Sequence, residues 1–293
     1  MLLLLALLTL TTPSVPAADL RADVEKWRAD RLARLTAEDG WLTLVGLSWL
    51  NEGENSVGAA AGSQVVFPSG RSPLRLGRIR VSGEKAHLDV APDVDVTHDG
   101  KKVRSIDLAS DEKGAPTVLR HGTLTFYLIR RGDRLGVRVK DTAAPTRKAF
   151  HGIDNYPISP EWRLDARFEP HAAGQTIAVP NILGSVTQEP SPGAFVVRIG
   201  GREYRLDAIE EEGESELFVI FGDRTNGTTT YGAGRFLYAA RPGADGHTVV
   251  DFNKAYNPPC AFTPFATCPL PPTRNRLPIP IAAGEKSYKG SGH

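Results

Sequence analysis

Side chains that can exchange protons or carry charge are concentrated between residues 222 and 276. Asp223 and Asp251 lie in this stretch, and two carboxyl groups can serve as the general acid and general base of a hydrolysis reaction. Arginine binds a carboxylate or phosphate with two parallel hydrogen bonds, which suits an anionic substrate. The residues expected to bind or orient the ligand are Tyr231, Arg235, Asn253, Tyr256, Asn257 and Arg276. The stretch therefore predicts a small-molecule pocket with Asp223 and Asp251 as its catalytic residues.

These polar residues also have a structural interpretation. Asp223 follows an apolar segment and precedes Asn226 and Gly227, so its side chain could serve a turn. Arg235 could form an ion pair with Asp223 or Asp251. The sequence leaves three functions open: an extracytoplasmic hydrolase acting on a small polar or anionic substrate, a non-catalytic binding protein for an anionic or carbohydrate ligand, and a structural or interaction module. Whether the protein is an enzyme is not decided by these residues.

Cys260 and Cys268 are the two cysteines of the chain, and seven residues separate them. In an exported protein the expected state is a disulfide. Closing so small a ring contributes roughly 2.6 kcal/mol on the chain-entropy estimate. Free structural thiols are one alternative, and a nucleophilic Cys260 with a base such as His151 is another. Two cysteines alone do not make a zinc site.

The sequence contains no cofactor motif. It lacks the nucleophile elbow Gly-x-Ser-x-Gly, a phosphate-binding loop, the His-Glu-x-x-His motif and a dinucleotide fingerprint. The most metal-like group is Asp93, Asp95, His98 and Asp99, but valines alternate with the first acids as on the exposed face of a strand. We therefore expect neither a cofactor nor a metal.

Composition limits the class of partner. The 293 residues include 35 Lys and Arg against 34 Asp and Glu, which gives a formal net charge of +1. Without a basic excess, nucleic acid is not expected as a partner. A small-molecule ligand remains the expected partner, and the oligomeric state cannot be read from the sequence.

Residues 1–18 have the features of an export signal. An apolar run from Leu2 to Leu10 is followed by Val15-Pro16-Ala17, whose small residues suit a signal peptidase. The run is too short to span a bilayer as a mature helix, and no later stretch is apolar enough, so no membrane span is expected in the mature chain. These features predict a periplasmic or secreted protein.

The rest of the chain is predicted to be mainly β. Residues 19–39 are expected to form an N-terminal helix, because apolar residues recur there with the helical period. Short apolar segments separated by turn residues predict a β-sandwich over 40–141, followed by a connector over 142–161. Residues 162–288 are expected to form a C-terminal β domain, an antiparallel sheet or barrel, whose Pro-rich loop carries both cysteines. Its expected strands include 229–237 and 248–252, and the alternation of the second continues over 251–254.

The order of segments in the first half resembles a forkhead-associated sandwich. The resemblance rests on Gly53-x-Asn55-x-x-Gly58, residues 63–68, a strand after Gly77, Asp99-Gly100 in a hairpin and a strand pair after Gly122. It implies the fold only. Residues 55–57, Asn-Ser-Val, stand where a phosphate-binding arginine is expected, so phosphopeptide binding is not inferred.

The second half carries longer motifs. These are Tyr-Gly-Ala-Gly-Arg-Phe-Leu-Tyr at 231–238, Asp-Phe-Asn-Lys-Ala-Tyr-Asn-Pro-Pro-Cys-Ala-Phe-Thr-Pro-Phe-Ala-Thr-Cys-Pro-Leu-Pro-Pro at 251–272, Asn-Arg-Leu at 275–277 and Ala-Gly-Glu-Lys at 283–286. They resemble the signature of a bacterial and archaeal family known as domain of unknown function 1684. The likeness extends to 40–42, 53–55 and 150–157, and so covers about 25–288. The resemblance implies no activity. The family includes members without an export signal, which implies that the cysteines do not serve only as a disulfide.

Overall fold

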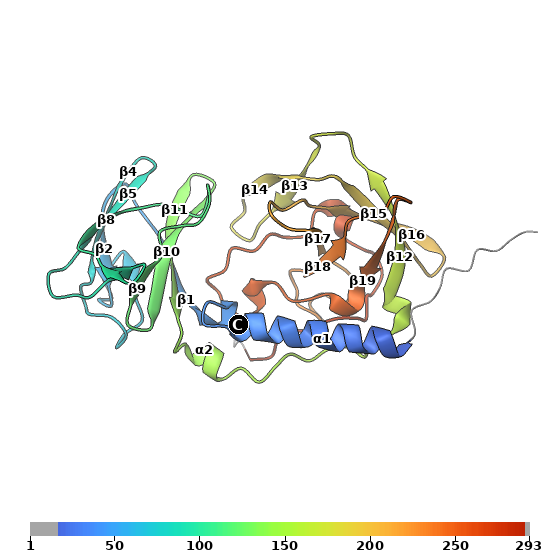
Figure 1. The fold of residues 1–293 in the computed structure, drawn as a ribbon, viewed down its shortest axis with the longest axis horizontal. Coiled ribbons are helices and arrows are strands. Elements are labelled where there is room, and N and C mark those ends of the chain that lie inside the picture. The colour runs from blue at the N-terminus through green and yellow to red at the C-terminus, as the bar shows by residue number, and fades with distance from the viewer. Residues whose placement is uncertain (1–16, 291–293) are drawn as a thin grey trace, which may run out of the picture.

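The computed structural model of the protein describes residues 17–290. The predicted export signal therefore lies outside the described residues, except for Ala17 and Ala18. The chain is mainly β, with 41% of residues in strands and 14% in helices. Figure 1 shows a β-sandwich at one end, a larger β domain at the other, and the long helix α1 (Ala17–Thr36) along the larger domain. The predicted fold class is confirmed.

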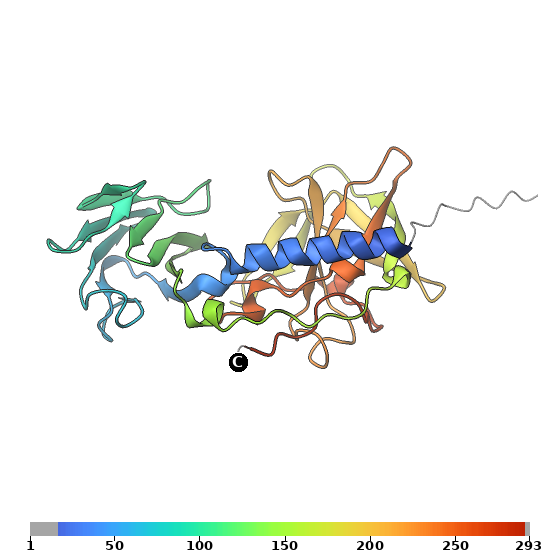
Figure 2. The same cartoon turned by 60° about the horizontal axis from the view of Figure 1, so that its bottom comes forward.

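Helix α1 packs through one apolar stripe. Leu20, Val24 and Leu35 are buried, whereas most of the charged residues between them are exposed, as an amphipathic surface helix requires. Arg31 points to the same side, and its guanidinium donates hydrogen bonds to the carboxylate of Glu285 (3.3 Å) and the carbonyl of Asn257 (3.0 Å). The helix is thereby fixed to the last segment of the chain. In the rotated view of Figure 2 it runs across the C-terminal domain and ends beside the sandwich.

The sandwich consists of two sheets, with strand orders β1-β11-β10-β9-β6-β7 and β3-β2-β4-β5-β8. Their strands are β1 (Leu44–Trp49), β2 (Gly53–Gly58), β3 (Val65–Val66), β4 (Gly77–Ser82), β5 (Lys85–Val90), β6 (Thr97–His98), β7 (Lys101–Lys102), β8 (Ser105–Leu108), β9 (Leu119–His121), β10 (Leu124–Arg131) and β11 (Arg134–Asp141). Val137 and Val139 of β11 point into the core with Phe67 and Phe126. Arg138 lies between the two valines and therefore faces away from this core.

The C-terminal domain contains one four-stranded sheet of order β16-β15-β12-β19 and the two-stranded sheets β17-β18 and β13-β14. Its strands are β12 (Arg163–Pro170), β13 (Thr176–Pro180), β14 (Val186–Pro190), β15 (Gly193–Ile199), β16 (Arg202–Ala208), β17 (Glu216–Phe221), β18 (Arg235–Ala240) and β19 (His247–Asp251). In β12, Ala166 is buried and Leu164 and Phe168 pack on the same cluster, which is the alternation expected for a strand with one buried face.

Asn275 connects two parts of this domain. It ends the short helix η5 (Thr273–Asn275), and its side-chain amide donates to the carbonyls of Asp207 and Ile220, both at 2.9 Å. Its side-chain oxygen accepts from the amide of Asp207 at 2.7 Å. Asn275 therefore supplies, from the Pro-rich loop, hydrogen bonds that link the ends of β16 and β17.

Three expected strand segments differ in the structure. Residues 94–96 form a loop before β6, with Val94 and Val96 buried and the carboxylate of Asp95 paired with Lys102 at 2.8 Å. Residues 229–234 form turns rather than the first part of a strand, because the backbone reverses before β18. Residues 252–254 form the short helix η3 (Phe252–Lys254) instead of continuing β19.

The other short helices are η1 (Trp41–Thr43), α2 (Pro145–Lys148), η2 (Pro160–Trp162) and η4 (Pro259–Ala261). Within residues 17–290, no helix combines the length and the apolar character that crossing a membrane requires.

Candidate functional site

Asp223 and Arg235 form an ion pair inside the C-terminal domain. Asp223 follows β17 and Arg235 begins β18, and pairing of these strands places Phe221 opposite Arg235. The guanidinium Nη2 of Arg235 lies 2.8 Å from Oδ2 of Asp223, and both side chains are 0% exposed. The observed arrangement is thus the structural ion pair that the sequence left open.

Neighbouring groups use most of the remaining hydrogen-bonding capacity of this pair, and only Nε of Arg235 has no hydrogen-bond partner within residues 17–290. Arg235 also donates to the carbonyls of Ala283 and Ile281, the latter at 2.9 Å. Oδ1 of Asp223 accepts from the amide of Ile281 (3.1 Å) and from the amide (2.8 Å) and hydroxyl (2.6 Å) of Thr225. Burial lowers the pKa of Arg235, and the charge of Asp223 opposes this effect. We call these five residues the Asp223 clasp.

The burial of the clasp contradicts two roles predicted from the sequence. Asp223 was predicted as an acid or base and Arg235 as a ligand-binding residue, but neither side chain reaches solvent. The physical reason is that the C-terminal segment at 281–283 covers both side chains. Their charges therefore neutralise each other and are not available to bind a charged substrate.

Asp251 belongs to a separate polar group. Its Oδ1 accepts from the amide (3.0 Å) and the side-chain nitrogen (2.8 Å) of Asn253, and its Oδ2 lies 3.2 Å from a guanidinium nitrogen of Arg163. Asn253 also exchanges hydrogen bonds with the backbone of Ser159. Asp223 and Asp251 thus have different cationic partners, so the structure does not form the predicted catalytic pair of carboxyl groups.

Asn257, Tyr231 and Arg276 do not converge on one ligand. Asn257 is buried, and its side chain donates to the carbonyl of Lys286 at 2.8 Å. Tyr231 is half-buried in an apolar cluster, where burial first and then the nearby cysteines raise its pKa to about 12. Arg276 is exposed. Of the predicted ligand-binding residues, only Tyr256 lines the larger cavity described below.

Cys260 and Cys268 are free thiols in the structure, so the predicted disulfide is not present in it. The amide of Cys260 donates to Sγ of Cys268 at 3.1 Å, and the amide of Cys268 donates to Sγ of Cys260 at 3.3 Å. A hydrogen bond from the Cys268 thiol is the main cause that lowers the pKa of Cys260. The same bond, together with burial, raises the pKa of Cys268. The two cysteines therefore form one coupled pair, with Cys260 as the more acidic thiol.

A cleft of ≈1030 Å³ lies where α1, the sandwich and the C-terminal domain meet. Helix α1 contributes Arg31 and Arg34, the sandwich contributes Arg131 and Arg138, and the segment before β17 contributes Glu211 and Glu214. Aromatic residues of β17 and β18 also line the cleft. The lining is completed by part of the segment that contains both cysteines, residues 259–269, which we call the cysteine loop. Residues from three parts of the chain are therefore needed to build this cleft.

Arg138 is the unusual charge in the cleft. It is only 5% exposed, its Nε has no hydrogen-bond partner, and no carboxylate within residues 17–290 forms an ion pair with it. Its guanidinium lies over the ring of Trp41 at 5.2 Å. Of the other arginines that line the cleft, Arg31 pairs with Glu285, Arg131 pairs with Asp111 at 3.0 Å, and Arg34 is exposed to solvent. A buried cation without a counter-charge is costly, so Arg138 is poised to bind an anion.

One wall of the cleft is aromatic. The rings of Tyr238 and Tyr256 are nearly parallel, with an interplanar angle of 8° and centroids 6.5 Å apart. Phe218 and Phe236 pack edge to face behind them. The hydroxyl of Tyr238 donates to the carboxylate of Glu211 at 2.5 Å, and burial is the main cause that raises the pKa of Tyr238. The wall therefore offers planar surfaces with fixed polar edges.

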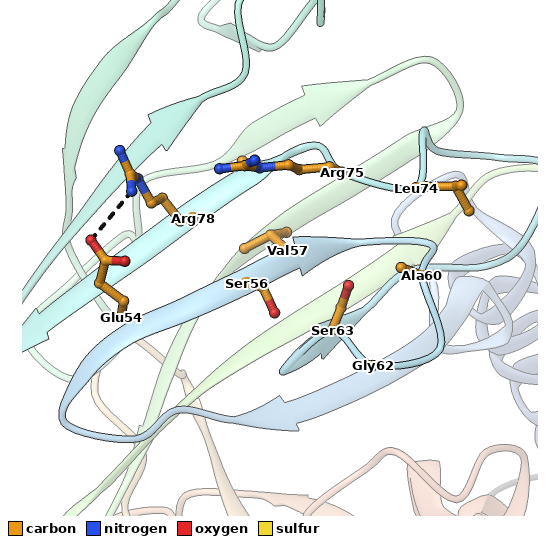
Figure 3. A pocket seen from close by; sticks show the side chains of 10 residues that line it. Glu54, Ser56, Val57, Ala60, Gly62, Ser63, Leu74, Arg75 and Arg78 are labelled. Carbon is orange, nitrogen blue, oxygen red and sulfur yellow. Dashed lines mark hydrogen bonds and ion pairs between the residues drawn. The ribbon is translucent and has the colours of Figure 1, made fainter.

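A second cavity, of ≈430 Å³, lies on the sandwich and is lined by residues of β2, β4 and the loops beside them. Figure 3 shows that Arg78 points to Glu54, and the two groups form an exposed ion pair at 3.4 Å. The Ser56 hydroxyl accepts from the amide of Gln64 at 3.0 Å, and Leu74 is 72% exposed. This cavity contains no buried unpaired charge among its lining residues, so it is the weaker candidate.

Ser191, His171 and Asp207 approach the composition of a catalytic triad. Oγ of Ser191 lies 3.2 Å from Nδ1 of His171, and Nε2 of His171 lies 3.7 Å from Oδ1 of Asp207. However, Ser191 is buried and its hydroxyl donates to the carbonyl of Ala208 at 2.7 Å. The hydroxyl is therefore not free to act as a nucleophile, and we assign the group a structural role. No set of three or more His, Cys, Asp or Glu within residues 17–290 is arranged to hold a metal ion.

Comparison with known proteins locates the clasp and the cysteine loop in one family segment. Residues 148–286 match the family described as "Protein of unknown function (DUF1684)". The match covers 139 of the 293 residues, all in the second half of the chain. The resemblance in the second half of the sequence is thus confirmed, whereas the likeness expected at 40–42 and 53–55 lies outside the match. None of the curated proteins that were compared matches the chain.

Solved structures give two kinds of similarity. The uncharacterized protein of Haloarcula marismortui, solved by NMR, is 28% identical over 48% of this chain and 78% of its own, with a TM-score of 0.40. The FHA domain of FhaA is 20% identical over 31% of this chain and 96% of its own, with a TM-score of 0.23. A domain from a study of phosphothreonine-dependent FHA interactions is 22% identical over 33% and 96%, with a TM-score of 0.24.

Proposed function

We propose that this protein binds a small, planar, anionic molecule in the cleft between α1, the sandwich and the C-terminal domain. The observation that carries the proposal is Arg138, a cation that is 5% exposed, has no carboxylate partner within residues 17–290 and lines a cleft of ≈1030 Å³. The volume is at the upper end of the range of small-molecule sites. The predicted export signal favours a periplasmic or secreted location for this binding.

The ligand class follows from the two walls. Arg138 offers guanidinium donors for a carboxylate, sulfonate or phosphate. Tyr238 and Tyr256 line the cleft with nearly parallel rings beside the guanidinium of Arg31, which lies 4.7 Å from the centroid of Tyr256. Aromatic contacts of a planar group with this wall add to the free energy of apolar burial. Glu211 and Glu214 at the rim can accept hydrogen bonds from donor groups on the ligand. We therefore expect an aromatic acid or a nucleotide rather than a simple inorganic anion.

Binding without turnover is favoured over hydrolysis. A hydrolase of the kind first considered needs two carboxyl groups at one cleft, but Asp223 and Asp251 are engaged with Arg235 and Arg163. Neither aspartate lines the cleft. The polar residues of the 222–276 stretch support the fold, and the cleft beside them supports binding.

Matched pairs of charged and neutral probes test the proposal. Thermal unfolding of the mature protein is measured with 2-naphthoate against 2-naphthalenemethanol, and with adenosine monophosphate against adenosine. A ligand that binds only the folded state raises the midpoint according to its affinity. We expect the anion of at least one pair to raise the midpoint more than its neutral counterpart.

The charge dependence is then assigned to one residue. Arg138→Met retains the length and apolar stem of the side chain and should weaken binding of the anion by about tenfold or more, the effect of losing a charge-assisted hydrogen bond of about 1.5–3 kcal/mol. Arg78→Met in the second cavity is the matched control and should leave the affinity unchanged. Equal binding to the wild-type protein and to Arg138→Met, or no shift with any of the four probes, rejects the proposed ligand class.

A further inference from the structure

The cysteine loop brings two thiols close to the cleft, in addition to forming part of its wall. Cys268 lines the cleft, and Cys260 packs in the same apolar cluster as Cys268 and Trp41. Trp41 is the ring over which the guanidinium of Arg138 lies. Trp41, Arg138 and Cys268 all line the cleft, and Cys260 belongs to the apolar cluster that includes Trp41 and Cys268.

The loop holds the two sulfurs toward each other. Each backbone amide of the pair donates to the sulfur of the other cysteine, at 3.1 and 3.3 Å. Pro258 and Pro259 precede Cys260, Pro264 lies between the cysteines, and Pro269 follows Cys268. Proline restricts the backbone, so little conformational freedom is left to separate the sulfurs. A disulfide between them needs little rearrangement of the loop.

The charge of the pair changes with its oxidation state. The reduced pair can hold one negative charge on Cys260, because the hydrogen bond from Cys268 and, to a smaller extent, the charge of Arg138 lower the pKa of Cys260. A disulfide holds no charge. When Cys260 is deprotonated, the reduced pair places an anion in the same cluster as Trp41, beside Arg138, and oxidation to the disulfide removes that anion.

We propose that Cys260 and Cys268 are a reversible dithiol–disulfide site that controls binding at Arg138, with the oxidised form binding the anionic ligand more tightly. The control of affinity rests on the proposed function of the cleft, whereas the oxidation of the pair does not. An exported protein meets oxidising surroundings, in which the binding-competent form is favoured.

The oxidation step uses a small-molecule disulfide as the oxidant. The thiolate of Cys260, the more exposed of the two sulfurs, attacks one sulfur of the oxidant, forms a mixed disulfide and releases one thiolate. Cys268 then loses its proton to that thiolate or to solvent and attacks Sγ of Cys260, which releases the second thiolate. Two protein thiols are oxidised to one disulfide, and one small disulfide is reduced to two thiols.

The coupling must also act in the other direction. If oxidation tightens anion binding by some factor, the bound anion stabilises the disulfide by the same factor, because linkage between two equilibria is reciprocal. Saturating anion should therefore shift the redox equilibrium of the pair toward the disulfide, and its neutral counterpart should not.

The experiment separates the oxidation from its effect on binding. The mature protein is equilibrated with mixtures of reduced and oxidised glutathione, free thiols are alkylated, and the masses report the fraction of disulfide. In parallel, the affinity for 2-naphthoate is measured in the fully reduced and fully oxidised protein. We expect reversible formation of one disulfide and an affinity about fivefold or more higher in the oxidised state, within the usual range of coupling between sites.

Two variants identify the sulfur responsible. Cys260→Ser carries no thiolate and should bind 2-naphthoate as tightly as the oxidised protein under all redox conditions. Cys268→Ser retains the Cys260 thiol but cannot form the internal disulfide, so its affinity should remain low in both buffers after mixed disulfides are excluded by mass. Binding of 2-naphthalenemethanol should not depend on the redox state.

Each outcome bears on a different statement. If no internal disulfide forms, the redox site is rejected whatever the ligand does. If the disulfide forms reversibly but the affinity for 2-naphthoate is the same in both states, the control of binding is rejected and the proposed function stands. If the disulfide forms and no probe binds in either state, the proposed function fails together with the coupling, and only the redox pair survives.

Discussion

The protein buries two arginines in opposite ways. Arg235 is 0% exposed, and its charge is compensated by Asp223 and by two backbone carbonyls from the end of the chain. Arg138 is 5% exposed, lies over Trp41 and has no carboxylate partner within residues 17–290. A compensated charge inside a domain contributes to the structure, whereas an uncompensated charge at a cleft can bind an anionic ligand. The cleft at Arg138 is therefore a better candidate for a binding site than the clasp, although the clasp is richer in polar motifs.

The largest expected effect is the loss of one partner of the clasp. Asp223→Ala leaves the Arg235 guanidinium buried without its counter-charge, which costs about 3–5 kcal/mol of the free energy of unfolding. Denaturant titration followed by tryptophan fluorescence measures this loss. Arg138→Met, in the same assay, should leave the free energy of unfolding unchanged or raise it, because it removes an uncompensated charge and retains the packing. A large loss of stability in Arg138→Met would show that Arg138 supports the fold instead.

The next effect concerns the glycine that allows the clasp to form. Gly234 has φ of +109°, and a Cβ there would lie 2.5 Å from Cγ of Pro271 and 2.8 Å from the carbonyl oxygen of Phe221. Gly234→Ala should lower the free energy of unfolding by about 1–3 kcal/mol through overpacking, and by more if the positive φ persists. Thermal or denaturant unfolding checks the result. Gly232→Ala is the matched control, because nothing lies closer than 3.7 Å to its added Cβ.

A smaller effect is expected on the pKa of Cys260, which depends on the charge of Arg138. The hydrogen bond from Cys268, and secondarily the charge of Arg138, lower the pKa of Cys260. The thiolate therefore persists to lower pH than in an ordinary cysteine, and alkylation of Cys260 by iodoacetamide should accelerate at a lower pH than alkylation of a free thiol. Arg138→Met removes one stabilising charge and should move the pH profile upward. Site-resolved mass spectrometry measures both profiles; coincident curves would place Arg138 too far from Cys260 to matter.

The smallest effect belongs to the exposed pair at the second cavity. Glu54 and Arg78 have side chains that are about half exposed, with their charged groups 3.4 Å apart. Arg78→Gln should change the free energy of unfolding by no more than about 0.5 kcal/mol, because solvent screens the pair and ordering two long side chains costs entropy. Chemical denaturation at low and moderate salt checks this value. If Arg78→Gln lowered the free energy of unfolding about as much as Asp223→Ala, solvent exposure would not explain the difference between the two ion pairs.

Hydrophobic patterning predicted most of the fold. Apolar and polar residues alternate in β12, and the hairpin of β10 and β11 turns at Gly132-Asp133, so strand existence and hairpin pairing could be read directly. The strand predicted at 229–234 failed because its polar side chains serve turns and Gly234 requires a positive φ. Local sequence does not reveal when a strand begins after such a turn.

The candidate site could not be predicted in the same way. The polar 222–276 stretch is distinctive in the sequence, but its charges meet partners that are distant in the chain, such as the backbone of Ile281 and Ala283. Arg138 instead lies within an apolar strand and resembles any solvent-facing residue of a hairpin. Its importance depends on the C-terminal domain covering that face of the sandwich, which alternation along a strand does not report. The one available signal was an arginine between two core valines, without an acidic neighbour at cross-strand positions Leu47 and Tyr127.

The contact between Arg31 and Glu285 has a consequence for folding during synthesis. The two residues are 254 positions apart, yet they form a buried pair that fixes α1 to the last segment of the chain. A ribosome or a translocation channel delivers the helix first and its counter-charge almost last. During that interval, the apolar stripe of α1 has no completed surface on which to dock, because contacts of long sequence separation form only when both partners have emerged. The buried contact of α1 with the last segment therefore forms only after nearly the whole chain has been synthesised.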